Sequence, residues 1–196
     1  MSFEVLDWNE IYDGCMELAD QIKKNGFNPE IIVGVARGGW IPARILSDLL
    51  GNTFVASIKV EFYKDVAETA KKPVVSQQVS TSVAGKRVLV VDDVADTGES
   101  LVTVRQNLLS RGASEVKIAT LHYKPKSILR PDFYVRETSA WIVYPHERHE
   151  FVENRVAKFK AQGKSMSDAK EELVRIGLPR NLIEKFVNEC WGHKDS

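Results

Sequence analysis

Short runs dominated by apolar residues recur along this chain, and the first two end at polar turns that contain glycine. The clearest runs are 31–35 (IIVGV), 88–91 (VLVV) and 116–121 (VKIATL). Strands with almost no polar positions are typical of a parallel sheet that is covered on both faces. Between the runs, apolar residues keep helical spacing at 8–24, at 40–50 and from about 98 to 112. This succession predicts an α/β fold, an open, mostly parallel sheet flanked by helices.

One stretch of the chain departs from this alternation. Residues 54–62 alternate like a strand with one wetter face, but 63–85 lacks periodicity and is rich in polar residues. A connection of this length inside a compact domain is usually functional, so we interpret 63–85 as a lid. Lys71 and Lys72 are then candidate phosphate contacts, with a solvated charge pair as the plainer alternative.

After about residue 148, the spacing of apolar residues predicts helices alone. Two apolar stripes at helical spacing surround a shorter helix that Ser167 can cap and Gly177 can end. We therefore predict two parts, a core with a small hood at 1–149 and a helical C-terminal extension at 150–196.

The run VLVVDDVADTGES places three aspartates and a tight turn at the end of an apolar strand. Ligands of open parallel sheets bind beyond the carboxyl ends of strands, which is where Asp92 and Asp93 fall. The helix after Gly98 offers free backbone N–H groups for a phosphate, and the hydroxyls of Thr97 and Ser100 add donors. Two adjacent carboxylates can hold ribose hydroxyls or a hydrated Mg²⁺. The alternative is a solvated acidic turn before a capped helix.

The same string resembles the diphosphoribosyl-binding signature of the type I phosphoribosyltransferases. The resemblance implies the fold of that family and a site for phosphoribosyl diphosphate. It implies that Asp92 and Asp93 bind the ribose hydroxyls, directly or through Mg²⁺ as cofactor. It further implies that the 5′-phosphate is cradled by Asp96, Thr97, Gly98, Glu99 and Ser100. Ser100 replaces the commoner Thr of the family but keeps the hydroxyl.

A second match follows the first apolar run. Arg37, Gly38 and Gly39 stand where that family has its pyrophosphate-binding loop. Arginine offers a fork of donors, and glycines leave backbone amides accessible to phosphate oxygens. The resemblance also implies a cis non-proline peptide in this loop.

A third match concerns the base that would accept the sugar. Lys124-Pro125 and the segment WIVYP, which begins at Trp141, resemble the hood of the 6-oxopurine phosphoribosyltransferases of bacterial and archaeal type. By this resemblance Lys124 donates to the 6-oxo group and Trp141 stacks on the purine, while Ile142 and Glu147 contact its other edge. A 6-oxo acceptor favours a cationic donor, whereas the 6-amino group of adenine would repel one. A solvated lysine and a core tryptophan are the alternatives.

The resemblance also names the catalytic residue and leaves the choice of base open. Asp96 is expected near N7 of the purine, where it accepts a proton or stabilises developing positive charge. Glu147 stands where Asp is expected in the xanthine/guanine enzymes, and His146 stands where Trp is frequent. Guanine, xanthine and hypoxanthine therefore all stay open as substrates in purine salvage.

The bulk composition disfavours several function classes. Lys+Arg and Asp+Glu both number 27, so no net charge draws the chain onto nucleic acid or a membrane. We found no signal-peptide pattern and only two cysteines, and we expect a cytoplasmic protein with free thiols. The resemblance implies a homo-oligomer, dimer or tetramer. Two alternatives stay open, a phosphoribosyltransferase for adenine or a pyrimidine, and a regulator that senses nucleotides or phosphoribosyl diphosphate on the same fold.

Overall fold

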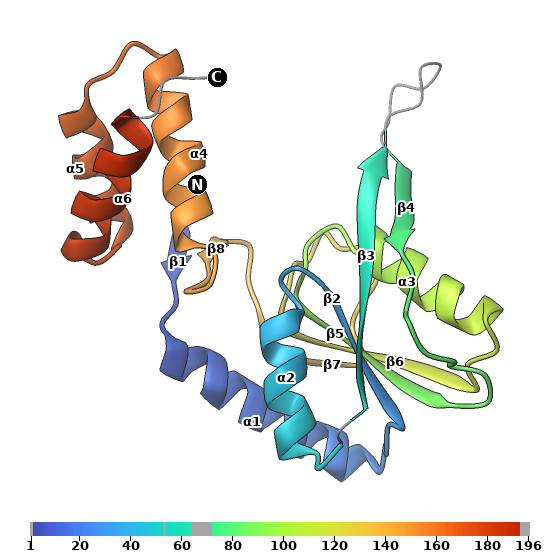
Figure 1. Ribbon diagram of the computed structural model, residues 1–196. Coiled ribbons are helices and arrows are strands. Elements are labelled where there is room, and N and C mark those ends of the chain that lie inside the picture. Colours follow the sequence, from blue (N-terminus) through green and yellow to red (C-terminus); the bar gives the residue numbers. More distant parts are fainter. Residues whose placement is uncertain (1, 53, 64–71, 193–196) are drawn as a thin grey trace. The chain divides into compact units, whose positions relative to one another are not determined.

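The structure is a computed structural model that describes residues 2–52, 54–63 and 72–192 (Figure 1). The chain divides into two compact units. The larger unit is Asn9–Ser139, and the smaller one joins Met1–Trp8 to Ala140–Ser196. None of the helices within these described ranges combines the length and the apolar character needed to cross a bilayer.

A single sheet forms the centre of the larger unit. Its strands are β2 (Ile31–Ala36), β3 (Val55–Tyr63), β4 (Lys72–Gln77), β5 (Arg87–Ala95), β6 (Glu115–Tyr123) and β7 (Phe133–Glu137). They lie in the order β4-β3-β2-β5-β6-β7, and all neighbours are parallel except the antiparallel pair β3 and β4. The predicted α/β fold with a mostly parallel sheet is therefore confirmed.

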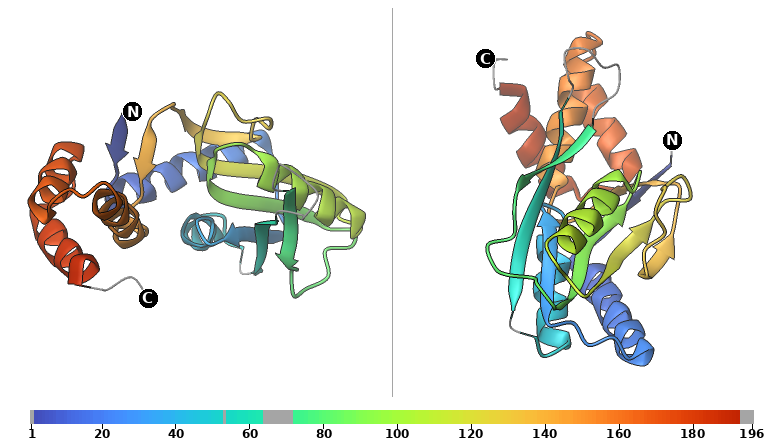
Figure 2. Two further views of the ribbon diagram at one scale, coloured as in Figure 1. Left: turned by 90° about the horizontal axis from the view of Figure 1, so that it is seen from above. Right: turned by 90° about the vertical axis from the view of Figure 1, so that its right-hand side faces the viewer.

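Helices cover both faces of this sheet (Figure 2). They are α1 (Trp8–Asn25), α2 (Trp40–Leu49) and α3 (Glu99–Ser110). On one face, α3 packs its buried leucines and valine against alternate apolar residues of β2, β5 and β6. On the other face, Gly34 of β2 lies against Ala43 of α2, and Gly14 of α1 lies against Leu121 of β6. Burial on both faces is the physical reason that these strands read as continuous apolar runs.

The structure corrects the prediction for 63–85. Residues 72–77 form β4, which pairs with β3 at the edge of the sheet. This part of 63–85 is therefore a strand and not an unpatterned connection. Pro73 is compatible with this place, because an edge strand tolerates a residue that cannot donate to the ladder. Lys72 begins β4, whereas Lys71 lies outside the described residues.

The smaller unit combines a two-stranded parallel sheet with three helices. The strands are β1 (Phe3–Val5) and β8 (Trp141–Val143), and the helices are α4 (Arg148–Ala161), α5 (Met166–Ile176) and α6 (Arg180–Gly192). Their shared core includes Val143 of β8 and buried residues of all three helices. Ser165, rather than the predicted Ser167, caps α5, and Asp168 completes a capping box with it. The extension predicted at 150–196 stays a prediction as a separate functional part.

Candidate active site

Two aspartates lie next to each other near the carboxyl end of β5. Asp93 is buried, with 8% of its surface exposed, and its backbone N donates to Asp92 Oδ1 at 3.0 Å. Burial raises the pKa of Asp92 well above its usual range, and the adjacent Asp93 carboxylate raises this pKa further. Holding both carboxylates ionised is therefore costly unless a cation shares the site.

This pair of carboxylates fits Mg²⁺ better than a metal held entirely by protein. In the described part of the chain, no three His, Cys, Asp or Glu side chains gather as a metal-binding group. Mg²⁺ usually takes one or two carboxylates and completes its octahedron with waters and substrate phosphates. Asp92 and Asp93 together supply such a donor set.

The loop between β2 and α2 packs directly against this carboxylate pair. Its first peptide, Ala36–Arg37, is cis, as the family resemblance implied. A Cβ at Gly38 would lie 2.5 Å from Cγ of Asp93, closer than carbon atoms approach. A Cβ at Gly39 would lie 2.7 Å from Val35 N. Because β2 and β5 are neighbours in the sheet, the loop that contains Gly38 and the Asp92-Asp93 pair meet at the carboxyl ends of these two strands.

The turn after β5 leads into α3 through a left-handed glycine. Gly98 has φ +82°, a conformation that favours glycine, and no side chain caps the start of α3. Its backbone also touches the loop after β6, since a Cβ there would lie 2.9 Å from Leu129 N. Thr97 Oγ1 accepts from Glu99 N at 3.4 Å. The turn therefore places the backbone N–H groups at the start of α3 beside an exposed hydroxyl, a combination that suits a phosphate.

Two lysines follow β6 next to this turn. Lys124 is only 8% exposed, which excludes the alternative of a solvated lysine. Its backbone N donates to the backbone O of Ala95 at 3.0 Å. Lys126 places its Nζ 2.9 Å from Asp96 Oδ1. Sequence reasoning missed Lys126, and its position two residues after Lys124 is the only signal that could have pointed to it.

The remaining predicted base contacts belong to the smaller unit, and their placement is described within it. Trp141 of β8 is 52% exposed, so it is not a core tryptophan, whereas Ile142 beside it is buried. Glu147 precedes α4, and its Oε1 accepts from Tyr144 N at 3.4 Å. His146 stacks on Tyr144 with ring centroids 5.2 Å apart.

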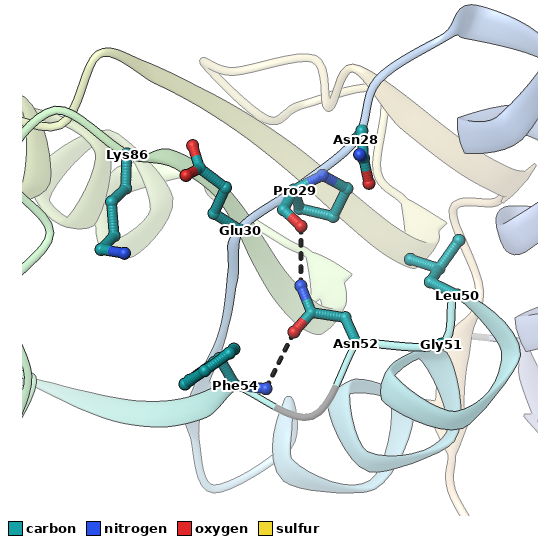
Figure 3. A pocket seen from close by; sticks show the side chains of 8 residues that line it. All are labelled: Asn28, Pro29, Glu30, Leu50, Gly51, Asn52, Phe54 and Lys86. Carbon is teal, nitrogen blue, oxygen red and sulfur yellow. Dashed lines mark hydrogen bonds between the residues drawn. The ribbon is translucent and has the colours of Figure 1, made fainter.

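A separate hollow of about 310 Å³ lies at the amino ends of β2, β3 and β5 (Figure 3). Asn52 lines this hollow. Its Nδ2 donates to Pro29 O at 2.7 Å, and its Oδ1 accepts from Phe54 N at 2.8 Å. Its lining consists of Asn28, Pro29, Glu30, Leu50, Gly51, Asn52, Phe54 and Lys86. None of the aspartates or glycines described above lines it, and the chemistry of the carboxylate turn is therefore at the other end of the strands.

Comparison with known proteins agrees with the class that this geometry defines. The phosphoribosyl transferase domain family matches residues 2–148, and the chain belongs to that family. The match ends where α4 begins, so helices α5 and α6 lie outside it.

Individual relatives act on purines according to their names. Xanthine-guanine phosphoribosyltransferase of Idiomarina loihiensis is 30% identical over 74% of this chain and 86% of its own length. Xanthine phosphoribosyltransferase 1 of Saccharomyces cerevisiae is 28% identical over 81% of this chain and 95% of its own. The crystal structure of a purine phosphoribosyltransferase from Pyrococcus horikoshii is 40% identical, with a TM-score of 0.68 over 74% of this chain and 94% of that one.

Proposed function

We propose that this protein transfers the 5-phosphoribosyl group from phosphoribosyl diphosphate to a 6-oxopurine, releasing pyrophosphate, in purine salvage. The observation that carries the proposal is the close approach of the Gly38 loop to Asp93, the neighbour of Asp92, shortly before the left-handed turn at Gly98 and the start of α3. The relatives named as purine phosphoribosyltransferases support the choice of acceptor.

The donor is held by groups of the larger unit. Asp92 and Asp93 bind the ribose hydroxyls and would hold Mg²⁺, which would supply positive charge to the diphosphate. Arg37 and the amide of Gly38 contact the pyrophosphate, where guanidinium donors match phosphate oxygens in pairs. The 5′-phosphate lies in the turn from Asp96 to Ser100, against the start of α3.

The reaction breaks the bond between C1′ and the pyrophosphate oxygen and forms one from C1′ to a purine nitrogen, with inversion at C1′. The sugar passes through oxocarbenium character, as in glycoside hydrolysis. Arg37 stabilises the charge that accumulates on departing pyrophosphate. Asp96 accepts the proton at N7 of the base or stabilises positive charge there. Water must be excluded, because it would otherwise capture the cation as free ribose phosphate.

The residues proposed to recognise the base follow the family resemblance. Lys124, which is buried, donates to the 6-oxo group. Trp141 stacks on the purine, while the backbone of Ile142 and the carboxylate of Glu147 contact the opposite edge. Glu147 Oε1 accepts a hydrogen bond from the backbone N of Tyr144, the residue that follows β8.

We further propose that the protein works in the cytoplasm as a homo-oligomer, with residues 1–149 as the catalytic part and 150–196 as a helical extension. Family resemblance supports the oligomer, and the end of the family match near residue 148 supports the division.

A panel of bases tests the proposed function. The protein is incubated with Mg²⁺, phosphoribosyl diphosphate and one of hypoxanthine, guanine, xanthine, adenine or uracil, and pyrophosphate release is measured. We expect release with at least one 6-oxopurine, and none with adenine, with uracil, or after chelation of Mg²⁺. Turnover of adenine or uracil alone would refute the choice of acceptor. Donor binding without turnover of any base would indicate a regulator.

A further inference from the structure

The loop 124–129, which follows β6, is fastened to the turn 95–98 by its backbone. Two hydrogen bonds join them, from Lys124 N to Ala95 O at 3.0 Å and from Ile128 N to Thr97 O at 2.9 Å. Gly98 adds a close approach, because a Cβ there would lie 2.9 Å from Leu129 N. The middle of the loop is therefore held beside Asp96 by main-chain contacts.

Lys126 stands in the middle of this loop and pairs with Asp96. Its Nζ lies 2.9 Å from Asp96 Oδ1, and the two side chains are 65% and 51% exposed. An ion pair this exposed contributes little to folding, because water screens the charges and ordering two side chains costs entropy. The pair places positive charge directly beside the Asp96 carboxylate.

We propose that Lys126 is a positioning residue for phosphoribosyl transfer and that it acts through Asp96. This inference rests on the proposed function. In that function the donor's 5′-phosphate binds the turn that carries Asp96, so phosphate and carboxylate repel each other across a short distance. Lys126 offsets this repulsion and keeps the carboxylate directed at the base, which Asp96 must reach to take its proton.

A different role for Lys126 would be a direct contact with the donor phosphate. The two roles differ in what they require of Asp96. A residue that acts through Asp96 loses its effect when Asp96 can no longer accept a proton, whereas a direct phosphate contact keeps its effect. A double-mutant cycle separates them, because residues that share one contact are non-additive.

The experiment compares wild type, Lys126→Met, Lys126→Arg, Asp96→Asn and the double variant Lys126→Met/Asp96→Asn in steady-state assays with varied donor and base. We expect Lys126→Met to lower kcat by about tenfold, less than the roughly 100-fold that a 1 Å misplacement costs, because Asp96 itself is still present. The KM for the donor should change by less than about threefold, and Lys126→Arg should restore kcat to within about threefold of wild type, because arginine keeps the charge. In the Asp96→Asn background, Lys126→Met should have no further effect.

Lys170→Met is the matched control. Lys170 pairs with Glu184 at 2.6 Å on the helices of the smaller unit, and its loss removes a lysine ion pair that has no part in the proposed reaction. We expect wild-type kinetics for this variant.

Each other outcome overturns the inference in a recognisable way. An equal loss from Lys126→Met in both backgrounds would assign Lys126 to the phosphate instead. Wild-type kinetics of Lys126→Met would leave it no role, although the proposed function would stand. A wild-type protein that turns over no base would instead refute the proposed function, and this role with it. The ¹³C carboxyl shift of Asp96 reports the pair itself without turnover, and an unchanged shift in Lys126→Met would show that no pair exists.

Discussion

Replacing Gly38 with alanine tests how the two motifs of the proposed donor site fit together. The added Cβ would lie 2.5 Å from Cγ and 2.7 Å from Oδ1 of Asp93, whereas ordinary contacts begin at 3.4 Å. Gly38 does not have positive φ, so the substitution adds steric overlap without backbone strain. Asp93 is buried, and we expect the carboxylate and loop to separate by about 1 Å, a misplacement that costs roughly 100-fold in rate.

The loss should be visible as a fall of about 100-fold in kcat/KM for the donor, equivalent to about 2.7 kcal/mol of transition-state stabilisation. The assay is the initial rate of pyrophosphate release at varied donor and Mg²⁺, with donor binding measured by calorimetry. Stability is followed separately by thermal unfolding, because overpacking costs about 1–3 kcal/mol.

Gly192→Ala is the matched control for this substitution. A Cβ at Gly192 meets no atom within 4 Å, and this glycine also lacks positive φ. A second background, Asp93→Ser, shortens the side chain that receives the overlap, and Gly38→Ala should have little further effect there. Wild-type donor affinity and kcat/KM in Gly38→Ala alone would refute the argument, because the Asp93 carboxylate would then not need its place against the loop.

Three other substitutions and measurements follow from the same geometry. Asp96→Asn should lower kcat by about 100-fold, the usual scale for a lost proton acceptor, while donor binding measured by calorimetry stays nearly unchanged. Asp48→Asn, at an exposed aspartate, is the control. Wild-type turnover of Asp96→Asn would remove Asp96 from the mechanism. Trp141→Ala should raise the KM of the purine by about tenfold, because base stacking contributes roughly 1–3 kcal/mol, and an equal rise in donor KM would contradict a stacking role. Burial raises the pKa of Cys15 to about 12, so at pH 8 this thiol should resist a disulfide reagent until the chain is unfolded, and rapid reaction in the folded state would contradict its burial.

The strand-turn-helix at β5 could be predicted because its signals are local. A covered strand, a glycine turn and an amphipathic helix follow one another within a short stretch, and each signal acts over only a few residues. The predicted strand at 88–91 was nevertheless too short, since β5 runs on to Ala95. Asp92, Asp93 and Ala95 near its end favour strands poorly, and this part remains extended because Asp92 and Ala95 pair with Thr120 and Tyr123 of β6. Such pairing overrides local β-propensity.

Other parts depended on contacts that a linear pattern does not contain. β1 has only three residues, and it exists as a strand through pairing with β8, which lies far along the chain. The close approach of Gly38 to Asp93 requires β2 to neighbour β5, although β3 and β4 lie between them in the sequence. The ion pair of Lys126 depends on the backbone anchoring of its loop, which nothing in the residues Lys124-Pro125-Lys126 specifies.

The distribution of charge in the proposed donor site argues for a polyanion bound together with a cation. Asp92, Asp93 and Asp96 supply negative charge at the end of β5, and burial of Asp92 makes its ionised form costly. A neutral sugar would need neither the backbone N–H groups at the start of α3 nor the glycine loop against Asp93. An activated sugar phosphate requires carboxylates for a hydrated cation and for ribose hydroxyls, beside amides for its phosphate. This combination of groups distinguishes such a donor from the other ligands that an open parallel sheet can bind.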